Sequence, residues 1–204
     1  MEDGRFIVFE GLDGSGKDTL LNNLIDYLNK ENREDVKVAS WYDYPNYRVL
    51  KESLKDIANT EDISSLIISL ATADMIHMSK DINKYLNDDF IVLCSRWYFS
   101  TFAYNGKSDV LENLITNKHI LTPRLLVYVD TPVEECIKRI NSRPLTIEKF
   151  ENEDTLRKID KMYKEKLNEI KDNKDIDVLV INGLEDPKTC LEKLISYVVS
   201  NNYI

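Results

Sequence analysis

The sequence predicts a three-layer α/β fold, in which a five-stranded parallel sheet has helices on both faces. Five short apolar segments alternate along the chain with segments whose apolar residues recur at helical spacing. Strands and helices that alternate in this way form right-handed crossovers, which give a parallel sheet. The run 90–94 contains no charged or strongly polar side chain, which is typical of a strand buried on both faces of such a sheet.

Each expected element follows from its own apolar pattern. We expect strands at residues 6–9, 36–41, 90–94, 125–130 and 178–181. We expect one helix from the glycine-rich turn to about residue 30, one that ends near residue 57, and one that begins at Pro132. Further helices are expected at 63–86, 109–118, 156–170 and 190–198. The stretch 141–149 breaks the helical pattern, so we expect a short lid at about 141–150. Because no linker or repeat interrupts the chain, residues 1–204 form a single expected domain.

Composition and charge argue against several classes of protein. The chain has 204 residues and a net charge of −9, which disfavours non-specific binding to nucleic acid or to an anionic membrane. No apolar run is long enough to span a bilayer and no signal peptide is visible, so we expect a cytoplasmic protein with no nucleic-acid or membrane partner. The cysteines at positions 94, 136 and 190 are isolated in apolar surroundings, so we expect buried free thiols.

A glycine-rich turn connects the first expected strand to the first expected helix. Residues Gly11 to Lys17 fit the pattern G-x-x-x-x-G-K, in which backbone N–H groups surround a phosphate and the following helix presents its positive end. Lys17 adds a mobile charge for the β- and γ-phosphates of a nucleotide. This context indicates a P-loop NTPase-type fold. The expected ATP-binding residues are Gly11, Leu12, Asp13, Gly14, Ser15, Gly16, Lys17, Asp18 and Thr19.

Several segments resemble the thymidylate kinase family, and they come in the family's order. The segment Phe9–Lys17 is very similar to the start of these enzymes, and Ser95–Tyr104 resembles their Asp-Arg-Tyr-x-x-Ser-x-x-Ala-Tyr segment. Weaker matches occur at Tyr44–Tyr47, Asp130–Cys136 and Glu148–Tyr163. The resemblance covers nearly the whole chain. It implies ATP-dependent, Mg²⁺-assisted phosphorylation of a deoxynucleoside monophosphate, most directly of dTMP to dTDP for dTTP synthesis.

The resemblance also implies roles for individual side chains. Lys17 and the loop amides hold the ATP phosphates, while the planar guanidinium of Arg96 binds the acceptor phosphate and the transferring group. Asp13 meets the acceptor sugar or the metal–phosphate cluster. Tyr104 lies near the deoxyribose, although spacing alone equally fits an ordinary half-buried aromatic on a helix. The further expected acceptor contacts are Tyr44, Pro45, Arg48, Ser100, Thr101 and Glu151.

Gly14 stands where some members of the family carry a catalytic arginine in the loop. Members with a small residue there usually place an arginine in the lid instead. We therefore expect Arg143 to close over ATP, with Arg139 as the alternative. A solvated charge near a helix end is the other interpretation of Arg143.

Two positions beside the phosphates depart from the family pattern. Asp18 replaces the Ser or Thr that ligates Mg²⁺ after the lysine, and Ser95 replaces the Asp that precedes Arg96. We hypothesise that the carboxylate has moved from one position to the other. A carboxylate is a good ligand for Mg²⁺, so the expected metal ligands are Asp18 and Asp13, with the Thr19 hydroxyl in reserve.

The expected base pocket departs from the family as well. Ala71 and Met75 stand where the family has a Phe that stacks on thymine and an Arg that hydrogen-bonds its carbonyl. Asn46 replaces a phosphate-binding Arg of the proline-containing loop, with Arg48 nearby. A pocket without those donors discriminates less between bases, so a broader or altered base preference is an alternative. His77 is a candidate base contact, although a lone histidine on a mostly apolar helix is more often structural.

Two other functions are compatible with the phosphate loop. A deoxynucleoside kinase shares the loop and a lid, but that group typically has Glu-Arg-Ser after the third strand, where this chain has Ser95-Arg96-Trp97. A nucleotide-binding protein that has lost catalysis is compatible with Asp18 and Ser95. The resemblance further implies a homodimer packed through helices beside the phosphate loop, and the helices that begin near Ile63 and Asp109 are candidates for its interface.

Overall fold

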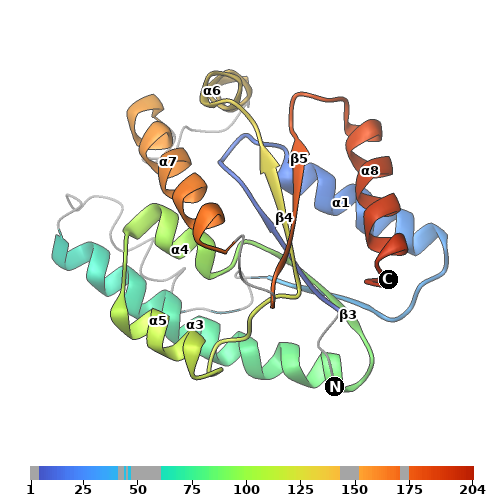
Figure 1. The fold of residues 1–204 in the computed structure, drawn as a ribbon, viewed down its shortest axis with the longest axis horizontal. Coiled ribbons are helices and arrows are strands. Elements are labelled where there is room, and N and C mark those ends of the chain that lie inside the picture. Colours follow the sequence, from blue (N-terminus) through green and yellow to red (C-terminus); the bar gives the residue numbers. More distant parts are fainter. Residues whose placement is uncertain (1–4, 41–43, 45, 47–60, 143–151, 171–174) are drawn as a thin grey trace.

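A parallel sheet of five strands lies at the centre of this computed structural model, which describes residues 5–40, 44, 46, 61–142, 152–170 and 175–204. The strands are β1 (Phe6–Glu10), β2 (Val36–Ala39), β3 (Ile91–Ser95), β4 (Leu125–Asp130) and β5 (Asp177–Asn182). Their order across the sheet is β2-β3-β1-β4-β5, and every neighbouring pair is parallel (Figure 1). This confirms the expected fold class.

The edge strand β2 is shorter than the sequence predicted. Its last pairing joins Ala39 to Cys94 of β3, and Ser40 lies outside the strand. In this register Ser40 would lie opposite Ser95, the last residue of β3, so β2 ends one residue before the end of its partner strand.

The described helices match the helical spacing of the sequence. They are α1 (Lys17–Lys30), α3 (Glu61–Asn87), α4 (Tyr98–Asn105), α5 (Asp109–Thr116), α6 (Val133–Asn141), α7 (Glu153–Ile170) and α8 (Pro187–Ser200). The bounds of α4 were not predicted, because its eight residues are too few to show a clear helical period. The helix expected to end near residue 57 and most of the expected lid lie outside the described residues.

Helices α1 and α8 cover one face of the sheet (Figure 1). Ile7 and Phe9 of β1 point to this side and belong to the same apolar cluster as Leu24 of α1 and Leu194 of α8. Successive side chains of a strand point to opposite faces, so Phe6 and the other alternate residues of β1 are left for the second face.

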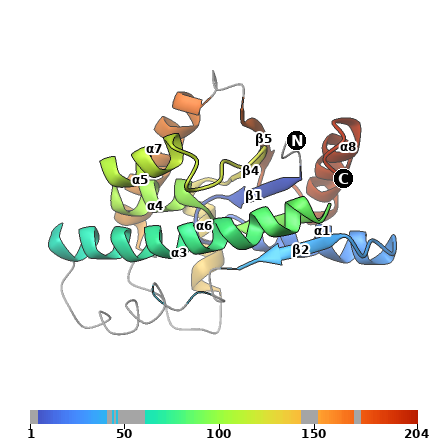
Figure 2. The same cartoon turned by 90° about the horizontal axis from the view of Figure 1, so that it is seen from below.

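The second face packs against α3, α4, α6 and α7. Phe6 and Val8 of β1 join Met75 of α3, Phe99 of α4 and Tyr163 of α7 in a single apolar cluster. Figure 2 shows α3 running along the sheet, with α4, α5 and α7 grouped towards one of its ends. Because β1, β3 and β4 supply both clusters, their sequences are continuous apolar runs rather than alternating ones.

The pairing of β1 with β3 brings two loops together at the carboxyl end of the sheet. Phe9 lies opposite Ser95, and the backbone N–H of Arg96 donates to the carbonyl of Phe9 at 2.9 Å. The loop that follows Glu10 and the turn that follows Ser95 therefore begin side by side. Ligands of open parallel sheets bind at this end of the strands.

The three cysteines are buried free thiols, as the sequence predicted. Burial raises the pKa of the Cys136 thiol to about 12, so this side chain stays protonated and unreactive near neutral pH. None of the helices in the described ranges has both the length and the apolarity that a membrane span requires.

Leu194→Ala tests the packing of α8 on the sheet. The Leu194 side chain is fully buried, so its truncation should lower the free energy of unfolding by about 2–5 kcal/mol, measured by urea denaturation. Val199→Ala on the same helix is the matched control, because Val199 is 50% exposed and its loss should change stability by no more than about 0.5 kcal/mol. Equal losses in the two variants would contradict this packing.

Candidate active site

The phosphate loop connects β1 to α1 and is closed by its own backbone. The N–H of Ser15 donates to the carbonyl of Leu12 at 3.1 Å, and Gly16 caps α1 with a positive φ of 97°. The Lys17 side chain is nearly buried, and its Nζ donates to Oδ2 of Asp18 at 2.9 Å. Burial and the nearby charge of Arg96 lower the pKa of Lys17, although the carboxylates of Asp18 and Asp13 act against this shift.

Gly14 lies against the backbone of α6. Its φ is +81°, and a Cβ atom at this position would lie 2.6 Å from the carbonyl oxygen of Cys136. The end of a flexible side chain can move away from such a contact, but the backbone atoms of α6 cannot. The loop arginine of some family members therefore has no room here.

Two side chains fix the far side of the loop. The Thr131 hydroxyl donates to the carbonyl of Ser15 at 2.9 Å. Arg139 donates to the same carbonyl from Nη1 at 3.1 Å, to that of Gly183 from Nη2 at 2.8 Å, and to Glu135 from Nε at 3.0 Å. Arg139, the alternative lid cation, therefore connects the phosphate loop to the turn after β5.

A cavity of about 270 Å³ lies beside this connection. Its walls come from the phosphate loop, α1, Arg139 of α6 and the turn between β5 and α8, and they include Thr19, Gly183, Glu185 and Pro187. A larger groove of about 610 Å³ lies between β5 and α8 and contains none of the expected site residues.

Arg96 occupies the turn after β3 in a left-handed backbone conformation, with a φ of 66°. A residue other than glycine rarely adopts this conformation, and such residues cluster at functional sites. The guanidinium Nη2 donates to Asp13 and, at 3.1 Å, to the hydroxyl of Tyr104. Nη1 donates to Ser100 Oγ at 3.1 Å and to the Tyr163 hydroxyl at 3.2 Å.

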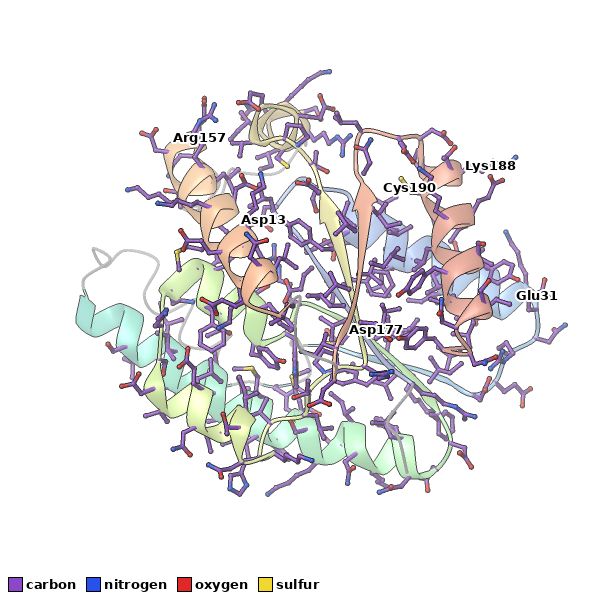
Figure 3. All side chains as sticks on the ribbon, in the orientation of Figure 1. Asp13, Glu31, Arg157, Asp177, Lys188 and Cys190 are labelled. Atoms are coloured by element: carbon purple, nitrogen blue, oxygen red, sulfur yellow. The ribbon has the colours of Figure 1, made fainter. Side chains whose placement is uncertain are left out.

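Asp13 is the main anionic partner of this guanidinium. It also accepts a hydrogen bond from the Tyr104 hydroxyl at 2.8 Å. Burial alone would raise the pKa of Asp13, but the charges of Arg96 and Lys17 and these hydrogen bonds hold it below its usual value. Figure 3 shows Asp13 towards the end of the sheet to which β4 and β5 point, while Asp177 lies at the other end. The structure thus brings together the predicted residues Asp13, Arg96, Ser100 and Tyr104.

Asp18 and Ser95 meet across the gap between the two loops. The Ser95 hydroxyl donates to Oδ1 of Asp18 at 2.6 Å, while Oδ2 accepts from Lys17. Burial opposes the charge of Asp18, but the charge of Lys17 and the hydrogen bonds from Ser95 and Lys17 keep its pKa below the usual value. The side chain of Asp18 is 64% exposed, so its ionised oxygens remain accessible from solvent.

The predicted acceptor side is described only in part. The Tyr44 hydroxyl donates to Asp81, and its ring meets that of His77 edge-on at 5.4 Å. Asn46 donates to the buried Asp74 at 2.7 Å.

Other predicted positions are buried or undescribed. Ala71, Met75 and Thr101 are all buried. Pro45, Arg48, Arg143 and Glu151 lie outside the described residues.

Sequence reasoning assigned no role to two residues of this network, Glu10 and Tyr163. Glu10 is fully buried at the end of β1, and the Tyr163 hydroxyl donates to its Oε2 at 2.8 Å. A signal for Glu10 is present in the sequence, because it is the one charged residue of a strand that is otherwise apolar. Tyr163 occupies a core position of α7, where a tyrosine looks like any other apolar side chain.

Comparisons with known proteins place thymidylate kinases among the relatives of this chain. A family model described as thymidylate kinase matches residues 9–186. A thymidylate kinase of Brachyspira hyodysenteriae is 28% identical over 91% of this chain and 95% of its own length. A probable thymidylate kinase of Saccharolobus solfataricus is 30% identical over 97% and 98%, and one of Methanococcus aeolicus is 30% identical over 81% and 80%.

Gly14→Ala tests the close approach of α6 to the loop. The added methyl would lie against the Cys136 carbonyl, and the positive φ is strained for alanine, so the ATP-binding conformation of the loop should become about 1–3 kcal/mol less stable. The Kd for ATP, measured by calorimetry, should therefore rise about tenfold or more. Gly106→Ala is the matched control, because Gly106 has a φ of +88° but no atom within 4 Å of an added Cβ. It should cost about 1 kcal/mol of stability and leave the Kd for ATP unchanged. A Gly14→Ala protein that binds ATP normally would contradict this geometry.

Proposed function

This chain belongs to the thymidylate kinase family, and we propose that it transfers the γ-phosphoryl group of ATP to dTMP, giving dTDP for dTTP synthesis. The observation that carries this proposal is the guanidinium of Arg96, held beside Asp13 at the end of β3 and next to the phosphate loop. Such a reaction needs little covalent chemistry from the protein. It needs two phosphate groups aligned and their negative charge neutralised.

The phosphate loop and Lys17 form the donor half of the proposed site. The loop amides and the N-terminus of α1 bind the ATP phosphates, and the Lys17 ammonium neutralises charge on the β- and γ-phosphates. Because Lys17 is nearly buried, little water screens its charge from the phosphates. Arg139 and Thr131 keep the loop in shape by binding the carbonyl of Ser15.

Arg96 and Asp13 form the acceptor half. The guanidinium of Arg96 binds the phosphate of dTMP and the phosphoryl group in transfer, where its planar fork matches two oxygens. Asp13 keeps the guanidinium in place and faces the acceptor sugar, together with Tyr104. Because Arg96, Asp13 and Tyr104 hold one another in place, they need little reorganisation in the transition state.

Asp18 is the residue we propose for Mg²⁺, with Asp13 nearby. The donor set fits this ion, because Mg²⁺ in kinases takes one or two carboxylates together with substrate phosphates and water. Within the ranges that the structure describes, no cluster of three or more His, Cys, Asp or Glu forms a closed metal cage. When bound, the ion supplies positive charge to the phosphate oxygens. The Ser95 hydroxyl orients the Asp18 carboxylate at 2.6 Å.

Several parts of the proposal rest on the family resemblance alone. We assign Arg143 to the lid over ATP, and Pro45, Arg48 and Glu151 to the acceptor site. The homodimer and the cytoplasmic location also stay predictions. The buried side chains of Ala71 and Met75 offer no hydrogen bond to a base, so they discriminate little between one base and another.

An ADP-release assay tests the reaction and its base preference. With ATP and Mg²⁺, we expect turnover of dTMP in preference to dUMP, dCMP, dAMP and dGMP, and none of free nucleosides. Arg96→Lys should lower kcat/KM for dTMP on the order of 10²–10³-fold, because an ammonium cannot reproduce the fork. Turnover of nucleosides would indicate a deoxynucleoside kinase. ATP binding without turnover would contradict a kinase of any kind.

Exchanging the residues at positions 18 and 95 tests the metal assignment. Asp18→Ser should raise the Mg²⁺ concentration for half-maximal rate by about tenfold or more. Ser95→Asp alone should lower the rate, because it places a second carboxylate at hydrogen-bond distance from Asp18, where the two negative charges repel each other. The double variant, Asp18→Ser with Ser95→Asp, should recover the Mg²⁺ dependence of the wild type. Normal Mg²⁺ dependence in Asp18→Ser would rule out the assignment.

A further inference from the structure

Glu10 is a fully buried carboxylate to which the proposed reaction assigns no role. It ends β1 immediately before the phosphate loop, and its side chain has no exposed surface. A buried carboxylate is costly to keep unless it is paired and hydrogen-bonded. Its partners therefore indicate what it does.

One oxygen of Glu10 binds the start of α4. Oε1 accepts hydrogen bonds from the backbone N–H of Trp97 at 2.7 Å and of Ser100 at 3.2 Å. An anion suits this position because a helix begins with unpaired N–H groups and a positive end. Arg96 immediately precedes this segment, so Glu10 fixes the backbone from which the guanidinium extends.

The other oxygen of Glu10 binds two hydroxyls. Oε2 accepts from Ser100 Oγ at 2.6 Å and from the Tyr163 hydroxyl at 2.8 Å. Each hydroxyl has a single proton, and a carboxylate can only accept. The two hydroxyl oxygens also lie 2.8 Å apart, where either can donate to the other. When both protons are directed at Glu10 instead, the lone pairs of the two oxygens are left for Nη1 of Arg96, which donates to them at 3.1 and 3.2 Å.

We propose that Glu10 is a positioning residue of the phosphoryl transfer. It holds the hydroxyls of Ser100 and Tyr163 so that both accept from Arg96, and it thereby fixes the guanidinium that binds the acceptor phosphate. Asp13 and Tyr104 hold Nη2 on the opposite side. This inference rests on the role proposed above for Arg96.

Burial and charge agree with this arrangement. Burial raises the pKa of Glu10, while the charge of Arg96 and the hydrogen bonds from Ser100, Trp97 and Tyr163 act against that rise. Protonated Glu10 would compete with the hydroxyl protons for the same space, so the ionised form suits the observed pattern of donors.

Glu10→Gln removes one acceptor while keeping the size of the side chain. Its amide oxygen can still accept from Trp97 and Ser100, but its NH₂ group donates where two hydroxyls also donate. The hydroxyls must then turn and compete with Arg96. We expect kcat/KM for dTMP to fall about 10- to 100-fold, while the Kd for ATP stays that of the wild type. A folded Glu10→Gln protein with the kcat/KM of the wild type would overturn the inference.

A double variant shows whether Glu10 acts through Arg96. If it does, Glu10→Gln should cause no further loss of kcat/KM in a protein that already carries Arg96→Lys, because residues that act as a unit are not additive. Losses that multiply in full would mean that Glu10 acts elsewhere, and the inference would be wrong.

Arginine side-chain NMR supplies a readout that does not depend on turnover. In the wild type, the bound guanidinium of Arg96 should rotate slowly and give resolved Nη–H signals, which Arg96→Lys identifies by their loss. Glu10→Gln should average these signals, and resolved signals in that variant would overturn the inference. If the wild type instead fails to phosphorylate dTMP, the proposed function fails while this comparison still decides the role of Glu10.

Tyr163→Phe covers the case in which Glu10→Gln does not fold. It removes one of the two connecting hydroxyls and should lower kcat/KM for dTMP in the same direction, by about tenfold or less. Tyr128→Phe is the matched control, since the Tyr128 ring packs against Tyr163 at 5.5 Å and lies in the same core. It should retain the kcat/KM of the wild type. Equal values for Tyr163→Phe and the wild type would overturn the inference.

Discussion

The parallel pairing of β1 with β3 is the constraint on which the rest of the site depends. It places Phe9 opposite Ser95, so the phosphate loop and the turn that carries Arg96 leave the sheet side by side. Two cations, Lys17 and Arg96, are thereby brought to one end of a tightly packed core. Such charges are tolerated only where carboxylates and hydroxyls satisfy them, and each of these cations has a carboxylate partner in this structure.

The charges are arranged so that positive and negative groups alternate across the end of the sheet. Asp18 lies beside Lys17, Asp13 lies beside Arg96, and Glu10 lies beneath the hydroxyls that Arg96 contacts. In this arrangement the opposite charges stabilise one another and at the same time position donors for a phosphate. A fixed set of this kind is the usual source of catalytic power in phosphoryl transfer, because the protein does not reorganise when charge develops.

The local pattern predicted the phosphate loop, and the resemblance to the family pointed to Asp13 and Arg96. The strands and the long helices were predicted as well, because their apolar periods are clear. Glu10 and Tyr163 were missed because their roles depend on contacts between residues that are far apart in the chain. The same limit applies to Arg139, which spacing placed near a lid and which the fold directs onto the carbonyls of the loop. Side-chain partners of this kind follow from tertiary packing, which no local pattern encodes.

The residues at positions 14 and 18 have a common physical explanation in the space around the loop. A Cβ at Gly14 would meet the backbone of Cys136, so a cation cannot be placed on the loop from this position. On the opposite side of the loop, Asp18 is exposed and reaches Ser95, so a carboxylate is available near the phosphates although Ser95 lacks one. Helix α6 thus limits the side chains that fit on one side of the loop, and α1 provides the Asp18 carboxylate on the other side. A side chain larger than glycine therefore meets backbone on the α6 side of the loop, whereas the Asp18 side chain is accommodated on the β3 side.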